Sequence, residues 1–79
     1  MAKAHKMRFK KISFLASKAD IAQEARAALI GRYGDFPPVQ ADLIVALGGD
    51  GFMLSTLHAT QGLRAPVYGM NRGTVGFLM

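Results

Sequence analysis

The sequence predicts an α/β fold: a partial doubly wound parallel sheet in the order strand, helix, strand, helix, strand (β-α-β-α-β). Short apolar stretches alternate with longer stretches of helical periodicity, which is typical of a parallel sheet with right-handed crossovers. One stretch, DLIVAL at 42–47, has Leu, Ile, Val and Ala as four consecutive residues. Both of its faces must therefore be covered, as in a central parallel strand.

The first strand and helix are predicted from the amino-terminal half of the chain. KISFLAS at 11–17 is apolar and too short for a free-standing helix, so it is interpreted as a buried strand. Residues 18–33 have apolar residues at helical spacing. Ser17 and Asp20 have the spacing of a capping box, and Gly34 is a plausible stop at the end of the helix.

The same order is predicted once more in the second half. A loop is expected at 34–41, because two consecutive prolines break both helix and sheet. A helix is expected at 51–61 and a third strand at 66–70, followed by a turn at 71–73. The last stretch, 74–79, carries no signal that ends an element.

The composition fits one small domain that is a piece of a larger protein. The chain has 79 residues, of which 51% are hydrophobic, a high fraction for so short a chain. It has no cysteine, which excludes a disulfide framework and a thiolate metal site. No apolar run approaches the roughly 20 residues that span a bilayer. No hydrophobic segment of signal-peptide type follows the basic start, so we expect a cytoplasmic protein without a membrane partner.

The positive charge is concentrated at the amino terminus. The formal net charge is +5, and five of the ten Lys and Arg residues lie in the first eleven positions. We interpret residues 1–8 as a basic tail and residues 9–79 as a partial α/β nucleotide-binding domain. No aromatic platform or helix-turn-helix pattern accompanies the tail, so no nucleic-acid partner is expected.

The candidate catalytic residue is Asp50, which lies between Gly49 and Gly51 directly after the second predicted strand. Ligands of open α/β sheets bind beyond the carboxyl ends of the strands, and glycines let a ligand approach the main chain closely. The N–H groups at the start of the following helix favour phosphate. Because a carboxylate repels phosphate, Asp50 is expected to act on a hydroxyl proton or on a metal. A compatible alternative is that Asp50 caps the helix at 51–61.

Several familiar sites are excluded by spacing. The chain has no G-x-x-x-x-G-K-[ST] motif, and Leu54 stands where G-x-G-x-x-G would need its third glycine. Two distant histidines without cysteine do not suggest zinc, and no metal-binding residues are expected. A Ser-His-Asp arrangement of Ser55, His58 and Asp50 has no nucleophile elbow to support it.

A second glycine-containing cluster, NRGTVGF at 71–77, follows the third predicted strand. It is expected at the same edge of the sheet, where both clusters line a shared cleft. Asn71 and Arg72 are candidates to hold phosphate or ribose, and Phe77 is a candidate to pack against a base. The alternatives are a solvated turn charge for Arg72 and core burial for Phe77.

LGGDGFML, followed by VYGMNRGTVGFLM, resembles the amino-terminal domain of bacterial NAD kinases. The first motif also marks diacylglycerol kinases, sphingosine kinases and phosphofructokinases, whereas the second narrows the resemblance to NAD kinase. The resemblance covers residues 9–79, nearly the whole chain but only part of a family member. It implies the amino-terminal half-domain of a larger two-domain kinase.

The resemblance implies transfer of a phosphoryl group from ATP, or in some members polyphosphate, to the 2′-hydroxyl of the adenosine ribose of NAD, giving NADP. Asp50 would take the proton from that hydroxyl, and Mg²⁺ would come with the ATP. The backbone of Gly51 and its neighbours would approach the nucleotide, while Leu54 and Phe77 would contact adenosine. The implied nucleotide-binding set is Gly49, Asp50, Gly51, Leu54, Asn71, Arg72, Gly73 and Phe77.

Family members continue with an Asn-Glu or Asn-Asp motif that binds NAD and with a β-rich carboxyl-terminal domain that completes the site and the oligomer. The isolated chain is therefore expected to be inactive, and the full-length parent to be a homo-oligomer. Some members carry a basic residue where this chain has Ser55. The alternative functions are another kinase with the glycine-aspartate loop, and a non-catalytic nucleotide-binding half-domain that docks on a partner.

Overall fold

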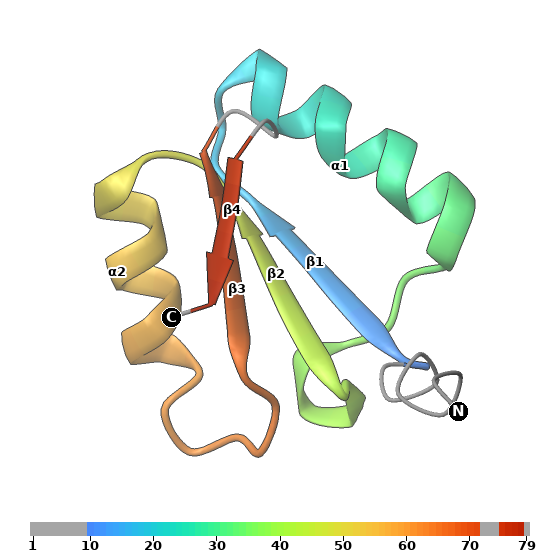
Figure 1. The fold of residues 1–79 in the computed structure, drawn as a ribbon, viewed down its shortest axis with the longest axis vertical. Coiled ribbons are helices and arrows are strands. Elements are labelled where there is room, and N and C mark those ends of the chain that lie inside the picture. Colours follow the sequence, from blue (N-terminus) through green and yellow to red (C-terminus); the bar gives the residue numbers. More distant parts are fainter. Residues whose placement is uncertain (1–9, 72–74, 79) are drawn as a thin grey trace, which may run out of the picture.

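The computed structural model describes residues 10–71 and 75–78. Figure 1 shows a central sheet with one α-helix on each side. In chain order the elements are β1 (Ile12–Ala16), α1 (Asp20–Tyr33), the short 3-10 helix η2 (Pro38–Gln40), β2 (Leu43–Leu47), α2 (Asp50–Ala59), β3 (Val67–Asn71) and β4 (Val75–Leu78). The predicted alternation of strands and α-helices is confirmed.

The described sheet has the strand order β1-β2-β3-β4. The first three strands are parallel, as predicted: Ile12 of β1 lies opposite Leu43, and Val67 of β3 lies opposite Ile44. β4 runs antiparallel to β3, with Val75 opposite Asn71. The sequence predicts no element for 74–79, so β4 is an addition to the predicted order. Asn71 was expected in a turn, but it is the last residue of β3, so that prediction was wrong. β4 pairs with the backbone groups on the outer side of β3. The pattern of side chains does not reveal this pairing, because it satisfies backbone groups.

β2 is the central strand, and its two faces pack against different helices. Ile44 and Ala46 are fully buried in a cluster with Met53 of α2. Val45 and Leu47, which point to the other face, lie in a cluster with Ala22 of α1. The prediction that both faces of 42–47 are covered is confirmed.

The two crossovers have opposite hands. The chain steps in the same direction from β1 to β2 and from β2 to β3, yet α1 and α2 lie on opposite faces of the sheet. One connection is therefore right-handed and the other has the rare left hand. The expectation that both are right-handed was wrong. Two right-handed crossovers in this order would place both helices on one face and leave one apolar face of β2 uncovered.

The ends of α1 differ in how well the sequence predicted them. The helix begins at Asp20 after Ala19, and no side chain caps it. Ser17 Oγ instead accepts the N–H of Ala19 at 3.4 Å, so the predicted capping box is not formed. Gly34 ends the helix as predicted: its φ is 88°, and its N–H donates to the carbonyl oxygen of Ile30 at 2.8 Å.

The end of α2 also differs from the prediction. The helix ends at Ala59 and not near Gly62, and the hydroxyl of buried Thr60 donates to the carbonyl oxygen of Thr56 at 2.8 Å.

Across the described ranges, neither α-helix is long and apolar enough to cross a membrane.

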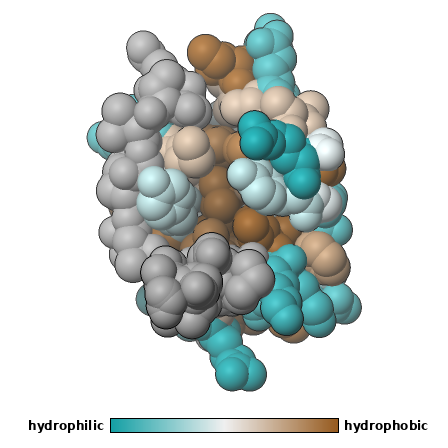
Figure 2. All heavy atoms as spheres, turned by 45° about the vertical axis from the view of Figure 1, so that its right-hand side comes forward, coloured by the Kyte–Doolittle hydropathy of each residue, from teal (hydrophilic) through white to brown (hydrophobic). Residues whose placement is uncertain are grey.

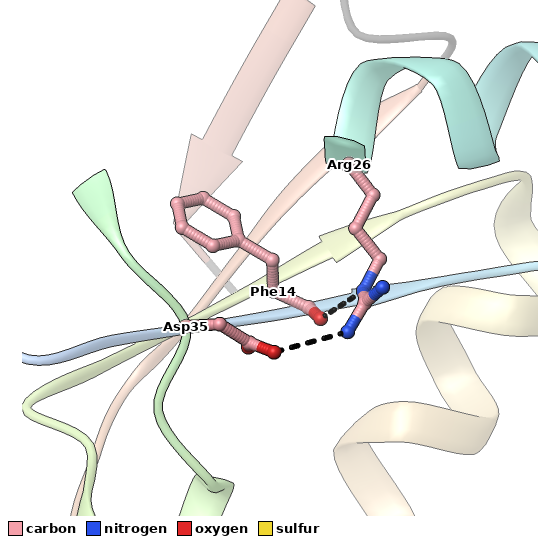
Figure 3. Close-up of polar contacts among 3 residues, drawn as sticks. All are labelled: Phe14, Arg26 and Asp35. Atoms are coloured by element: carbon pink, nitrogen blue, oxygen red, sulfur yellow. Dashed lines mark hydrogen bonds and ion pairs between the residues drawn. The ribbon is translucent and has the colours of Figure 1, made fainter. Parts of the chain in front are cut away.

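The outer edge of β1 is closed by polar contacts from α1 and the loop that follows it. The N–H of Phe36 donates to the carbonyl oxygen of Ile12 at 3.3 Å. Arg26 Nε donates to the carbonyl oxygen of Phe14 at 2.8 Å, and Arg26 Nη2 lies 3.5 Å from Asp35 Oδ2 (Figure 3). Because these carbonyl groups are occupied, β1 is protected from pairing with another strand.

We expect Arg26→Met to lower the free energy of unfolding by about 1–2 kcal/mol, because it removes a charged donor from a strand carbonyl. Asp35→Asn is the matched control. It weakens only a partly exposed ion pair and should cost less than about 1 kcal/mol. Urea unfolding of the two variants measures the difference, and equal losses would show that the contact with Phe14 does not contribute.

Hydrophobic surface remains open on the described part of the molecule. Figure 2 shows hydrophobic residues through the middle of one face, with hydrophilic residues to their right. On the α1 side of the sheet, Tyr68 and Met70 of β3 are only partly buried, since α1 packs against β1 and β2. The high apolar fraction of the chain therefore exceeds what this small fold buries.

Candidate functional site

The carboxyl ends of the parallel strands meet at one edge of the sheet, and hydrogen bonds continue past the strand ends. The N–H of Ser17 donates to the carbonyl oxygen of Leu47 at 2.9 Å, and the N–H of Gly48 donates to the carbonyl oxygen of Met70 at 3.1 Å. These bonds hold the turn after β1, the turn after β2 and the end of β3 side by side. The glycine-aspartate loop lies at this edge, as expected.

A cavity of about 300 Å³ opens at this edge. The turns after β1 and β2, the first turns of α1 and α2, and the last residue of β3 contribute to its wall. The lining residues are Ser17, Ala19, Ile21, Ala22, Gly48, Gly49, Asp50 and Asn71. Three of the predicted site residues, Gly49, Asp50 and Asn71, are thus brought together.

The two glycines before Asp50 have different environments. Gly48 is buried, and a Cβ there would lie 2.9 Å from Phe52 Cδ2 and 3.1 Å from Ser17 Cβ. Gly49 is exposed, and a Cβ there would meet no atom of the described chain within 4 Å. Packing therefore requires a glycine at 48, whereas the open space at 49 allows a ligand to approach the main chain. The same open space surrounds Gly51.

Asp50 is the first residue of α2 and is exposed on the cavity wall. Gly49 is the N-cap, and no side chain caps the helix. The carbonyl oxygen of Gly49 accepts the N–H of Met53 at 3.0 Å, which starts the helical ladder. The alternative interpretation of Asp50 as a helix cap is thus not what the geometry shows. Its carboxylate is available to a ligand.

Leu54 lies one turn beyond Asp50 in α2 and is 54% exposed. It does not line the cavity with Asp50, but residues four apart share a helix face. The backbone of Phe77 pairs with Gly69 across β3 and β4. Arg72 and Gly73 lie outside the described residues.

Part of the cavity wall comes from the turn after β1, which no sequence motif marks. Ser17, Ala19, Ile21 and Ala22 line the cavity, but Ala and Ile carry no chemical signature in a sequence. One signal was available: the turn after every parallel strand ends at the edge where ligands bind. The four residues lie in that turn and in the first turn of α1.

A bound metal ion would find few protein ligands here. The described residues hold no group of three or more His, Cys, Asp or Glu side chains placed to bind a metal. Among the described residues that line the cavity, Asp50 is the one carboxylate. Mg²⁺ is usually bound by one or two carboxylates together with substrate phosphates and water, so the cavity fits Mg²⁺ that arrives with a nucleotide.

Comparison with known proteins identifies the family. A profile of the ATP-NAD kinase N-terminal domain matches residues 1–79. An NAD kinase of Cereibacter sphaeroides (strain ATCC 17025) is 67% identical over 69 residues, which is 87% of this chain and 27% of that protein. An NAD kinase of Rhizobium meliloti (strain 1021) is 58% identical over 72 residues, 91% of this chain and 28% of that protein.

An NAD kinase of Caulobacter vibrioides is 56% identical over 69 residues, 87% of this chain and 26% of that protein. No solved structure gives a significant match. The chain spans little more than a quarter of the length of these relatives. The match along all 79 residues and the identities to three NAD kinases show that the chain belongs to the ATP-NAD kinase family and carries its amino-terminal domain.

Proposed function

We propose that this chain is the amino-terminal part of an NAD kinase, which transfers the terminal phosphoryl group of ATP to the 2′-hydroxyl of the adenosine ribose of NAD and gives NADP. The observation that carries the proposal is the exposed carboxylate of Asp50 at the start of α2, on the wall of a cavity at the carboxyl edge of the sheet. Family membership supports NAD and ATP as the substrates. Polyphosphate is the alternative donor.

Asp50 is the catalytic base in this proposal. The ribose hydroxyl is a poor nucleophile, and a positioned carboxylate that accepts its proton contributes typically 10²–10⁴-fold to the rate. As the ribose oxygen forms a bond to the γ-phosphorus of ATP, the bond from that phosphorus to the bridging oxygen breaks and the proton passes to Asp50.

The remaining predicted residues bind the nucleotides in this proposal. The backbone at Gly49 and Gly51 approaches the substrate where a Cβ would meet open space. Leu54, exposed one turn beyond Asp50, contacts the adenosine of NAD together with Phe77. Asn71, Arg72 and Gly73 hold phosphate or ribose.

Magnesium enters with ATP. Among the described residues of the cavity wall, Asp50 carries the one carboxylate, and a carboxylate is a type of ligand that Mg²⁺ prefers. When bound, Mg²⁺ neutralises charge that develops on the phosphates during transfer. The chain's own contribution is positioning: the glycine backbone and the first turn of α2 orient the reacting groups around Asp50.

The proposal includes the rest of the protein. A β-rich carboxyl-terminal domain with an Asn-Glu or Asn-Asp motif would complete the NAD site and form the contacts of a homo-oligomer in the cytoplasm. The relatives are nearly four times as long as the matched segment, which leaves room for such a domain. The 79-residue chain does not contain that motif, so on its own it should not form NADP.

The acceptor specificity of the full-length protein tests the proposal. With ATP as donor, we expect phosphorylation of NAD and none of diacylglycerol or fructose 6-phosphate, the acceptors of other kinases with a similar glycine-aspartate loop. Radiolabel transfer from ATP measures all three acceptors in one format. The isolated 79-residue chain is the control and should show no NADP formation. Phosphorylation of one of the other acceptors in preference to NAD would overturn the assignment.

A further inference from the structure

The cavity has a second wall that the family motifs do not include. It comes from the turn between β1 and α1 and lines the same cavity as the glycine-aspartate loop. Ala19, Ile21 and Ala22 make it apolar, and Ser17 adds one polar side chain. Small-molecule sites commonly combine an apolar lining with a few placed polar groups.

Ile21 is the unusual residue of this wall. It is 53% exposed although it is a large aliphatic side chain in the first turn of α1. Single exposed hydrophobic residues are common on protein surfaces and need no explanation. The position distinguishes Ile21: among the large exposed hydrophobic residues of the described chain, it is the one that lines the cavity with Asp50.

The part of the cavity that this chain encloses has room for a small ligand group beside Ile21. Its volume of about 300 Å³ is at the lower end of the range for small-molecule sites. This part of the site therefore has room for about the base and sugar of one nucleoside. A flat ring placed against Ile21 would lie in the same cavity as the glycine backbone, since Gly49 and Asp50 also line it.

We infer that Ile21 is a specificity-determining contact for the ring of a substrate nucleoside, with the turn between β1 and α1 as the second wall of the nucleotide site. This inference rests on the proposed kinase function. The ring could belong to ATP or to NAD, because both substrates carry an adenine. The contact is apolar and does not discriminate by hydrogen bonding, so it acts through the fit of the ring.

The test compares variants of the full-length protein. Ile21→Ser removes the apolar contact, and Ile21→Val keeps most of it. Val39→Ser is the matched control, because Val39 is also a β-branched aliphatic residue, is 72% exposed, and lies in η2 before β2, away from this cavity. Steady-state kinetics with ATP and NAD varied separately give KM for each substrate, and calorimetric titration of each nucleotide gives its Kd.

Ile21→Ser is expected to raise KM and Kd for one of the two nucleotides about tenfold, which is the low end for lost apolar contacts in a partly open site. The kcat of Ile21→Ser should change little. In Ile21→Val the KM should stay close to that of the wild type, and in Val39→Ser both KM and kcat should equal the wild-type values. An effect on ATP alone places the donor at Ile21, and an effect on NAD alone places the acceptor there.

Unchanged KM and Kd for both nucleotides in Ile21→Ser would overturn the inference. A lower unfolding temperature with unchanged KM would do the same, because it would show that Ile21 packs against another protein segment. The proposed function fails separately, by the absence of NADP formation in the wild type. In that case the titrations still decide whether Ile21 contacts a bound nucleotide.

Discussion

Asp50→Asn is expected to lower kcat for NADP formation by the full-length protein about 10²–10⁴-fold, the usual contribution of a general base. Asn has nearly the same size and can stand at the first position of α2, but it cannot accept a proton from the ribose hydroxyl. Because the side chain is exposed and no capping bond depends on it, the fold should be unaffected. Binding of NAD and ATP, measured by titration, should be largely retained.

Asp20→Asn is the control for this substitution. Asp20 is the first residue of α1, as Asp50 is of α2, and it is likewise exposed. Both changes remove a negative charge from a helix start, where it interacts favourably with the helix dipole by a few tenths to about 1 kcal/mol. Only Asp50 lies on the cavity wall. The control should therefore reproduce the small change in stability without the loss of rate.

The result also separates the competing functions. A large loss of kcat with nucleotide binding retained is expected if Asp50 is a catalytic base. It is not expected if the chain is a non-catalytic nucleotide-binding domain. An unchanged rate in Asp50→Asn would show that the carboxylate is not needed for proton transfer. The interpretation of this chain as a nucleotide-binding half-domain that docks on a partner would then be the better one.

The sequence predicts the elements whose burial is strong and local. β2 was predicted from its continuous apolar run, and Ile44, Ala46 and Leu47 are fully buried on two faces. The stop of α1 at Gly34 was predicted because a φ of 88° favours glycine. In both cases the physical cause lies within a few residues of the position it determines.

The failures concern choices that depend on distant parts of the chain. β4 pairs with β3 through backbone groups, and its residues carry no pattern that separates a strand from a tail. The opposite hands of the crossovers follow from the need to cover both faces of β2, which is a property of the whole sheet. The capping box had the right spacing, but the chain enters α1 with Ala19 at the N-cap.

The candidate site was predicted in the same uneven way. The glycine-aspartate loop combines three glycines with one carboxylate in four adjacent residues directly after a predicted strand, so the sequence predicts its place at the carboxyl edge. Ile21 and the rest of the turn after β1 reach the same cavity only because the parallel pairing of β1 with β2 brings the two turns together. Nor does the sequence distinguish the roles of the glycines, which look equivalent in the GGDG motif.

Gly48→Ala and Gly51→Ala are expected to have opposite effects on stability. At Gly48 the new Cβ would lie 3.1 Å from both Phe52 Cβ and Ser17 Cβ, so α2 or the turn after β1 must shift. Such overpacking typically costs about 1–3 kcal/mol. At Gly51, inside the first turn of α2, the new Cβ meets no described atom within 4 Å. Alanine is the better helix former by roughly 0.5–1 kcal/mol, so this variant should unfold at the same or a higher urea concentration.

Gly51→Ala is expected to lower the activity of the enzyme without lowering its stability. If the nucleotide approaches the main chain there, a methyl group displaces it by about 1 Å, and a misplacement of that size can cost about 10²-fold in rate. NADP formation and urea unfolding, measured on the same full-length variants, give both quantities. A Gly51→Ala enzyme as active as the wild type would show that the substrate does not need the open space at this position. A stabilised enzyme with a large loss of kcat/KM would show instead that the glycine is kept for the ligand, because the fold itself is better served by alanine.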